Sequence, residues 1–381
     1  MSSTQILLSA GEASGDLYAA QLAAALKTRT NCELFGMGGD QMRAAGVDVI
    51  TDCSEVSVLG ITEILGHLPQ LIRAMRRLVD AARRRRPALA ILTDFPGFHL
   101  RLARKLKPLG VRNVYYICPQ FWAWRPWRVR IVRRRFALAL CIFPFEEKFF
   151  GDAGVPVKFI GHPLVGRVAP AQTREGFFAA HRLDPLRKLV TILPGSRNSE
   201  LARHLPVLRE ACVKIQAEAP VEFVVAAAPG RAGSLEKGWP KGLKVQVVEG
   251  QTYDALAHAD ASIVSSGTAT VEAALLDAPM IVVYRVSPLT AVLAKPLVRT
   301  KYFSMVNLIA GREVVPELIQ QDFTPGSVAG HILHLLRHPA ASSTMRAALS
   351  EVRRKLGPPG AVERAADAIA ALLANRSGNA S

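Results

Sequence analysis

The sequence lacks a long apolar run, although half of its 381 residues are hydrophobic. Its longest apolar stretches, residues 136–145 and 273–284, are too short to cross a bilayer as a helix. The N-terminus enters a strand-like run with no basic segment and no cleavage site, so no signal peptide is expected. The five cysteines are scattered and include no CxxC pair, which argues against a disulfide framework and favours the cytosol.

Several signatures of nucleotide and metal chemistry are also absent. There is no P-loop lysine motif, and Gly36-Met37-Gly38-Gly39 has Gln41 where a dinucleotide fingerprint needs its third glycine. No two aspartates are spaced two apart, as a metal-dependent sugar-nucleotide site requires. His162, His204 and His258 each stand alone, without neighbouring metal ligands. We therefore expect neither a metal nor a cofactor.

Acidic residues are scarce in one part of the chain. Residues 66–135 hold 18 Lys and Arg against Asp80 and Asp94, a balance of +16 out of +17 for the whole chain. A basic surface this localised favours a polyanionic partner, which could be phospholipid headgroups, a phosphorylated lipid or nucleic acid. A solvated basic face without a partner is the plainer interpretation.

Short apolar runs alternate with helical stretches along the whole chain, which predicts parallel sheets covered by helices. A linker-like stretch at residues 169–173 separates two such series. The first series has strands predicted at residues 5–10, 33–37, 88–94, 113–118, 138–143 and 157–160. The second has strands predicted at residues 189–193, 222–227, 245–248, 262–264 and 279–284. The fold class is thus α/β, with two Rossmann-like doubly wound domains facing a cleft, where ligands bind at the carboxyl ends of the strands.

Glycine and small polar residues fill the turn after the first strand, residues 9–16. Ser14 or Asp16 could cap the following helix, and free N–H groups there attract anions. Because the turn also contains Glu12 and Asp16, sugar hydroxyls are expected ligands as well. A tight strand-to-helix turn needs glycine in any case, so a purely structural role stays open.

Two turns of the second series have the character of a diphosphate site. In residues 193–200, Ser196 could cap a helix and Arg197 offers a bidentate fork for a diphosphate. In residues 265–272, Ser266, Gly267 and Thr268 suit phosphate, and Glu272 suits ribose hydroxyls. Each turn alone could be an ordinary capped helix, but two in one domain favour a nucleoside diphosphate.

Tryptophan is concentrated in one basic segment, where Phe121, Trp122, Trp124 and Trp127 alternate with arginines such as Arg128. Aromatic and basic residues together suit a membrane surface or an acyl-chain site. They also suit stacking on nucleic acid, or the segment could pack as part of a core.

These segments, in this order, resemble the lipid A disaccharide synthase family, whose glycosyltransferases have the GT-B architecture. The resemblance runs nearly end to end and rests on residues 11–16, 60–66, 94–96, 122–125, 159–163, 193–197, 266–269 and 307–313. It implies transfer of 2,3-diacylglucosamine from its UDP derivative to 2,3-diacylglucosamine 1-phosphate, with a β-1,6 linkage and release of UDP. It also implies metal-free inverting chemistry, peripheral contact with the cytoplasmic face of the inner membrane, and a homodimer.

The resemblance assigns roles to individual residues. Asp94 is the expected base, because it follows a strand and has apolar neighbours that should raise its pKa above about 3.9. Glu12 is its catalytic rival, with Asp16 a second one. The residues expected to bind the UDP donor are Ser14, Gly15, Arg197, Ser266, Gly267, Thr268, Glu272 and Asn307. Those expected to contact lipid or membrane are Phe121, Trp122, Trp127 and Arg128. Some relatives have Asp-Phe-Asn where this chain has Gly97-Phe98-His99, which leaves no second carboxylate there.

The same residues divide the chain into an acceptor- and lipid-binding domain, 1–165, and a UDP-sugar-binding domain, 166–381. The C-terminal helices would either cross back to the first domain or be swapped in a dimer. Two other functions fit parts of the sequence. One is a different GT-B enzyme acting on UDP-N-acetylglucosamine. The other is a nucleic-acid-binding protein, which would leave the diphosphate-type turns unexplained.

Overall fold

The computed structural model describes residues 3–56, 68–288, 290–291 and 300–377. The chain divides into two compact units, the first made of Met1–Pro163 with Gly357–Ser381 and the second of Leu164–Leu356. The motif at residues 60–66 lies outside the described residues. None of the helices within the described ranges combines the length and apolar content that a membrane span requires.

The first unit is built on a parallel sheet in the order β3-β2-β1-β4-β5-β6-β7. Its strands are β1 (Thr4–Ala10), β2 (Cys32–Gly38), β3 (Asp48–Asp52), β4 (Leu89–Thr93), β5 (Arg112–Tyr116), β6 (Leu138–Cys141) and β7 (Val157–Phe159). The strand order reverses between β1 and β4, where Ala10 pairs with Thr93. The turns after these two strands therefore leave the sheet side by side, at the position where doubly wound sheets bind ligands.

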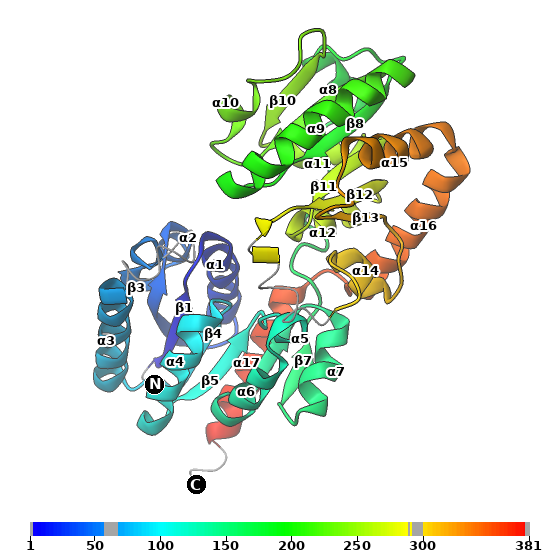
Figure 1. The fold of residues 1–381 in the computed structure, drawn as a ribbon. Helices are drawn as coiled ribbons and strands as arrows, with labels where there is room; N and C mark the ends of the chain where they lie inside the picture. Colours follow the sequence, from blue (N-terminus) through cyan, green and yellow to red (C-terminus); the bar gives the residue numbers. More distant parts are fainter. Residues whose placement is uncertain (1–2, 57–67, 289, 292–299, 378–381) are drawn as a thin grey trace. The chain divides into compact units, whose positions relative to one another are not determined.

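Helices cover both faces of this sheet (Figure 1). They are α1 (Ala13–Lys27), α2 (Asp40–Ala44), α3 (Leu68–Arg85), α4 (Pro96–Leu106), α5 (Phe121–Trp124), α6 (Val129–Arg135), α7 (Pro144–Asp152) and α17 (Ala361–Ser377), with short 3-10 turns η1 (Cys53–Glu55), η2 (Lys107–Leu109) and η3 (Pro126–Arg128). Helix α4 contacts both α3 and α6, and these three helices pack their apolar sides into one core on the sheet. Their exposed sides bear most of the arginines of residues 66–135.

The C-terminal helix belongs to the first unit, because α17 packs against α1. Arg29 pairs with Asp367 at 2.5 Å, and Arg112 donates to the carbonyl of Leu372 at 2.6 Å. The guanidinium of Arg364 donates to the carbonyl of Ile160 at 2.8 Å. Within one chain the last helix thus crosses back, so the second unit ends at Leu356 rather than at the C-terminus.

The second unit repeats the architecture with a parallel sheet in the order β10-β9-β8-β11-β12-β13. Its strands are β8 (Lys188–Leu193), β9 (Val221–Ala227), β10 (Val245–Glu249), β11 (Ala261–Ser265), β12 (Met280–Tyr284) and β13 (Glu317–Ile319). Its helices are α8 (Arg174–Ala180), α9 (Asn198–Glu218), α10 (Ala232–Leu235), α11 (Thr252–Ala257), α12 (Thr268–Leu275), α14 (Met305–Ala310), α15 (Pro325–Arg337) and α16 (Pro339–Lys355). Here the order reverses between β8 and β11, where Leu193 pairs with Val264.

The predicted α/β fold class is confirmed, and every predicted strand overlaps an observed one. Two observed strands, β3 and β13, were not predicted. Both are short strands at a sheet edge and only partly buried, so their sequences lack the continuous apolar run that marks the central strands.

Candidate active site

The turn after β1 places Glu12 at the N-terminus of α1, with its side chain exposed, and Ser14, two residues further on, is also exposed. Neither Ser14 nor Asp16 caps this helix, contrary to the sequence-based expectation, since the N-cap residue is Glu12 and no side chain caps it. Glycine is needed at position 11, because a Cβ there would lie 2.2 Å from Cδ1 of Phe95, which packs against it. Gly15 is buried against Ala10, so it serves packing between α1 and the sheet.

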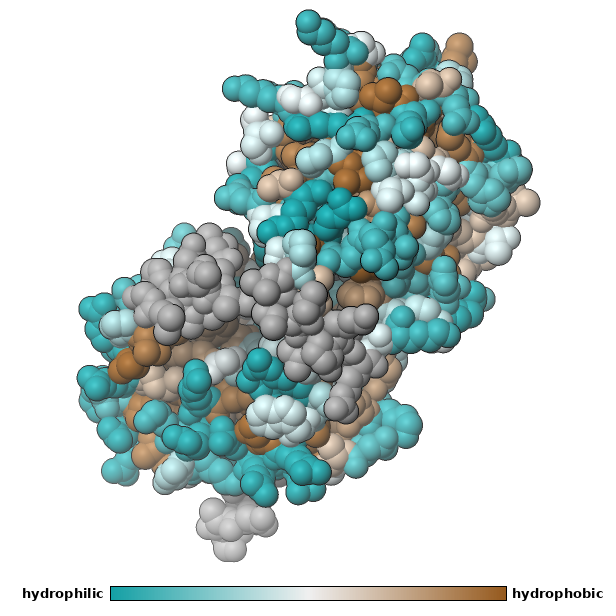
Figure 2. All heavy atoms as spheres, viewed as in Figure 1, coloured by the Kyte–Doolittle hydropathy of each residue, from teal (hydrophilic) through white to brown (hydrophobic). Residues whose placement is uncertain are grey.

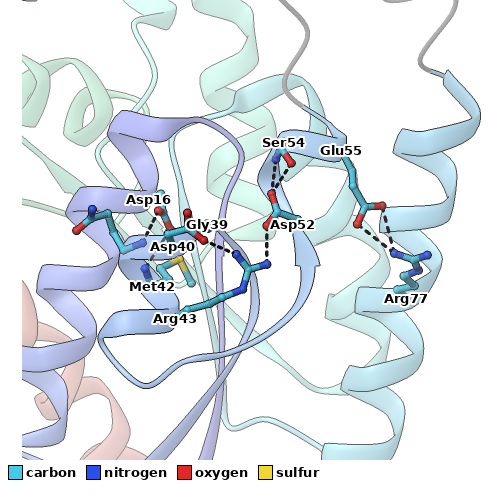
Figure 3. Close-up of polar contacts among 10 residues, drawn as sticks. Asp16, Gly39, Asp40, Met42, Arg43, Asp52, Ser54, Glu55 and Arg77 are labelled. Carbon is cyan, nitrogen blue, oxygen red and sulfur yellow. Dashed lines mark hydrogen bonds and ion pairs between the residues drawn. The ribbon is translucent and has the colours of Figure 1, made fainter. Parts of the chain in front are cut away.

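Asp16 has a structural role that removes it as a rival base (Figure 3). Its carboxylate is only 4% exposed and accepts hydrogen bonds from the N–H groups of Gly39 at 2.6 Å, Gln41 at 3.0 Å and Met42 at 3.3 Å. These are the N–H groups at the start of α2, so Asp16 caps that helix from α1. With three N–H groups bound to its oxygens and little of the residue exposed, Asp16 is assigned to the capping of α2 rather than to proton transfer.

Asp94 follows β4 in a strained turn that several side chains hold in place. Asp94 and Phe95 both have a left-handed backbone, with φ of 48° and 47°, which costs energy for non-glycine residues. The carbonyl of Asp94 accepts hydrogen bonds from Nδ1 of His99 at 2.8 Å and from the hydroxyl of Tyr115 at 3.0 Å. Nε2 of His99 then accepts from the hydroxyl of Ser9 at 2.9 Å. His99 and Tyr115 therefore brace the turn, a role that the sequence did not reveal.

The carboxyl group of Asp94 has an unusual electrostatic environment. Burial, with the negative charge of Glu12 as a second cause, raises its pKa to about 6. The turns after β1 and β4 thus bring Glu12 and Asp94 together, as the strand order predicts. An acid with a pKa near neutrality is well suited to accept and return a proton.

Glu146 is a second buried carboxyl group in this unit, and no motif of the sequence points to it. It lies in the first turn of α7, where Oε1 accepts from Nε1 of Trp122 at 3.0 Å and Oε2 from the N–H of Phe143 at 3.2 Å. Burial raises its pKa to about 8, and the charge of Asp94 acts in the same direction. A glutamate at this position looks like an ordinary capping residue, so only its burial beside Trp122 distinguishes it.

The aromatic segment is part core and part surface. Phe121 is fully buried in the core of the first unit, so the expectation that it contacts lipid is wrong. Trp122 is half-buried, and its Nε1 donates to the buried Glu146. Trp124 and Trp127 are 39% and 59% exposed. Arg128 lies over the rings of Phe121, Trp124 and Trp127, at 5.5–5.9 Å from their centroids.

In the second unit, the turn after β8 differs from an open phosphate cradle. The N–H groups of Ser196 and Arg197 donate to Oε2 of Glu200 at 3.1 and 3.2 Å, and the Arg197 guanidinium pairs with Oε1 at 2.9 Å. Arg197, not Ser196, is the N-cap residue of α9. The expected anion-binding groups are therefore already bound to a carboxylate of the same turn.

The turn after β11 remains more open. Gly267 is the N-cap residue of α12 with φ of 153°, and a Cβ there would meet nothing within 4 Å. Ser266 and Thr268 flank it, and the hydroxyl of Ser266 donates to the carbonyl of Phe303 at 3.2 Å. One turn into α12, Glu272 accepts from the hydroxyl of Tyr253 at 3.4 Å, and burial raises its pKa.

The turns after β8 and β11 line one cavity of about 650 Å³, a volume typical of small-molecule sites. Its other walls come from the end of β9 and from the start of α11. The residues that line it include Arg197, Glu200, Ser266, Gly267, Thr268 and Glu272. The second unit thus brings together five of the six donor-site residues predicted there.

Asn307 is the predicted donor-site residue that does not line this cavity. Its side chain is fully buried and donates to the carbonyl of Val315 and to Glu317, while its oxygen accepts from the N–H groups of Val314 and Val315. These bonds use the hydrogen-bonding capacity of the amide to hold the loop after α14, so no group is left for a nucleotide. Among the described residues, no cluster of His, Cys, Asp or Glu is arranged to hold a metal ion.

The sequence profile of the family described as "Lipid-A-disaccharide synthetase" matches residues 6–371. The chain belongs to the lipid-A-disaccharide synthetase family. A lipid-A-disaccharide synthase of Solibacter usitatus is 47% identical over 371 residues, and one of Myxococcus xanthus is 42% identical over 373 residues, each alignment covering 97% of both chains. Family membership makes the protein a glycosyltransferase of lipid A disaccharide synthesis.

Solved structures with lower identity share the fold. The Staphylococcus aureus MnaA–UDP co-structure has a TM-score of 0.63 at 11% identity over 94% of both chains. The calicheamicin glycosyltransferase CalG4 has a TM-score of 0.58 at 18% identity, covering 98% of this chain and 99% of its own. These likenesses, with the two parallel sheets, identify the family's fold as GT-B.

Proposed function

We propose that this member of the lipid-A-disaccharide synthetase family transfers 2,3-diacylglucosamine from its UDP derivative to 2,3-diacylglucosamine 1-phosphate. The product is a β-1,6-linked disaccharide 1-phosphate, and UDP leaves. The acceptor hydroxyl attacks the anomeric carbon from the face opposite UDP, so the configuration inverts. The hydroxyl must lose its proton as the new bond forms, which requires a base.

Asp94 is the proposed base, and its environment is the observation that carries the proposal. It lies at the carboxyl end of a central strand, at the reversal of strand order, with a pKa raised to about 6 by burial and by Glu12. Glu12 is proposed to raise the basicity of Asp94 and to bind substrate hydroxyls, because its own side chain is exposed. Ser14 is exposed beside it, while the buried Gly15 acts by allowing close packing.

The donor nucleotide is proposed to bind in the cavity of the second unit. Arg197 would pair with the diphosphate, and the N–H groups and hydroxyls around Gly267 would bind its oxygens. Glu272 would accept from the ribose hydroxyls. Because Glu200 now occupies the N–H groups of Ser196 and Arg197, it would have to yield Arg197 to the diphosphate or share it. Asn307 supports this unit from its interior.

The first unit is proposed to rest on an anionic membrane surface, on the cytoplasmic face of the inner membrane. Figure 2 shows hydrophilic residues spread over the side where α3, α4 and α6 lie, with hydrophobic ones between them. We define the basic face as the exposed arginines of α3 and α6, namely Arg73, Arg76, Arg77, Arg83, Arg84, Arg85, Arg130, Arg133 and Arg134. Leu68, Ile72 and Trp127 are 47%, 44% and 59% exposed and supply apolar area.

The test is to incubate the purified protein with both diacyl substrates and to follow UDP and a disaccharide 1-phosphate by mass spectrometry. We expect both products, in equal amounts. Water-soluble UDP-N-acetylglucosamine, offered as the only sugar nucleotide, should not be consumed. Consumption of that compound without a disaccharide would favour a different GT-B activity.

A further inference from the structure

Three arginines of the first unit lie together. Arg101 is on α4, Arg125 follows α5 and Arg128 ends η3, and these elements contact one another through α6. Burial, followed by the positive charges of Arg125 and Arg101, lowers the pKa of Arg128. Arg128 is therefore within electrostatic range of both Arg125 and Arg101, and Arg125 and Arg128 lie over the same ring, that of Trp124, at 4.4 and 5.9 Å from its centroid. We call these three residues the arginine cluster.

Among the described residues, the arginine cluster lacks an acidic partner, unlike some arginines of this unit but like others such as Arg104 and Arg130. Arg43, Arg77, Arg83 and Arg85 pair with Asp52, Glu55, Asp80 and Asp48 at 2.5–3.2 Å. In the part of the chain that the structure describes, no carboxylate lies within ion-pair distance of Arg101, Arg125 or Arg128. Three like charges held together without a counter-charge are unfavourable, and a bound anion would remove that cost.

Aromatic rings orient two of these guanidinium groups. Arg125 lies over the ring of Trp124 at 4.4 Å, and Arg128 lies 5.5 Å from the ring of Trp127. A guanidinium that stacks by its flat face keeps its N–H edge available for a bidentate contact with an anion. The guanidinium of Arg101 lies over no ring that is described, and it donates one long hydrogen bond, to the carbonyl of Gly97 at 3.4 Å.

The arginine cluster lies close to the proposed base. The hydroxyl of Tyr115, which donates to the carbonyl of Asp94, is within electrostatic range of both Asp94 and Arg128. Arg101 contacts the carbonyl of Gly97, three residues after Asp94 in the same turn and helix. An anion held by these arginines would therefore belong to a molecule that also reaches the active-site turn.

We propose that Arg101, Arg125 and Arg128 form a phosphate site that binds the phosphate monoester of the acceptor and so positions its sugar at Asp94. A phosphate monoester carries between one and two negative charges near pH 7 and has three oxygens, which suits several guanidinium groups at once. This inference rests on the proposed function, since that function supplies a substrate with such a group. A phospholipid headgroup offers the same phosphate chemistry, and the experiment separates the two sources.

The first arm measures acceptor selectivity with the full-length protein in neutral detergent micelles. Two acceptors are compared, 2,3-diacylglucosamine 1-phosphate and the same sugar without its phosphate. Arg125→Gln and Arg128→Gln should raise KM for the phosphorylated acceptor about 10- to 150-fold, equivalent to losing a charge-assisted contact of about 1.5–3 kcal/mol. KM for the unphosphorylated acceptor should not change. Arg104→Gln, on the same helix as Arg101, is the matched control and should keep the wild-type preference.

The second arm measures binding without turnover. Dodecyl phosphate should change the tryptophan emission of the wild type saturably, through Trp124 and Trp127, whereas neutral dodecyl maltoside should not. Arg125→Gln should lose the response to dodecyl phosphate. This arm decides on the phosphate site even if the wild type forms no disaccharide, a result that would contradict the proposed function alone.

Two results would overturn the inference. One is an unchanged preference for the phosphorylated acceptor in both variants, together with a response of Arg125→Gln to dodecyl phosphate that equals the response of the wild type. The other is that Arg125→Gln and Arg128→Gln lose binding to anionic vesicles while both keep the wild-type preference for the phosphorylated acceptor. That result would assign the arginine cluster to phospholipid headgroups.

Discussion

The pH dependence of turnover tests whether Asp94 is the base. Because burial and Glu12 raise its pKa to about 6, Asp94 should be about 97% ionised at pH 7.5. Below pH 6, kcat/KM should fall about tenfold for each pH unit as the base becomes protonated. Asp94→Asn keeps the shape of the side chain and removes its basicity, so turnover should drop roughly 10²- to 10⁴-fold. UDP binding, measured by calorimetry, should stay nearly unchanged.

The Glu12→Gln variant distinguishes the role of Glu12 from that of Asp94. Removing the charge of Glu12 lowers the pKa of Asp94, so the acidic limb of the profile should move to lower pH. Asp80→Asn, which breaks a surface ion pair with Arg83 on α3, should leave the limb where it is. The reasoning is refuted if the wild-type profile is flat between pH 5 and 7. If Glu12→Gln abolishes turnover while Asp94→Asn retains it, the roles must be exchanged.

The same pKa predicts a stability effect with a defined sign. An acid whose pKa is higher in the folded state than in the unfolded chain favours folding most when protonated, and this contribution is lost as pH rises from about 3.8 to about 6. Asp94→Asn should therefore stabilise the first unit at pH 8, by at most about 3 kcal/mol, and have little effect near pH 4. Thermal unfolding at the two pH values measures the difference.

Three further outcomes are expected. Arg197→Ala should weaken UDP binding tenfold or more by calorimetry, because a charge-assisted contact of about 1.5–3 kcal/mol is lost, and Arg203→Ala on the same helix should not. Gly11→Ala should abolish turnover without affecting UDP affinity, because its Cβ would lie 2.2 Å from the ring of Phe95, whereas Gly97→Ala meets nothing within 4 Å and should be tolerated. Sedimentation should show binding to anionic but not to neutral vesicles, weakening as salt rises, and equal, salt-insensitive binding to both would contradict a role for the basic face.

Local features of the sequence were sufficient to predict the fold, and they also predict where in that fold the chemistry takes place. Continuous apolar runs mark the central strands, and glycine or hydroxyl residues mark the turns that follow them. Since parallel strands present their carboxyl ends at one edge, the sequence predicts that the turns at residues 11–16, 94–95, 194–197 and 265–268 bind ligands. The order of the motifs also predicted the family, because that order is a property of the amino-acid sequence and needs no knowledge of the packing.

Only the tertiary structure decided what each polar group in those turns does. Asp16 and Glu12 look alike in the sequence, yet Asp16 caps a helix 23 residues or more away while Glu12 faces solvent. Glu200 accepts hydrogen bonds from the turn that precedes its helix, and the side chain of Asn307 is bound to the loop that follows α14. The position of α17 against α1 likewise follows from contacts between residues more than 300 apart. Burial and hydrogen-bond partners depend on which segments pack together, and a pattern of neighbouring residues does not contain that information.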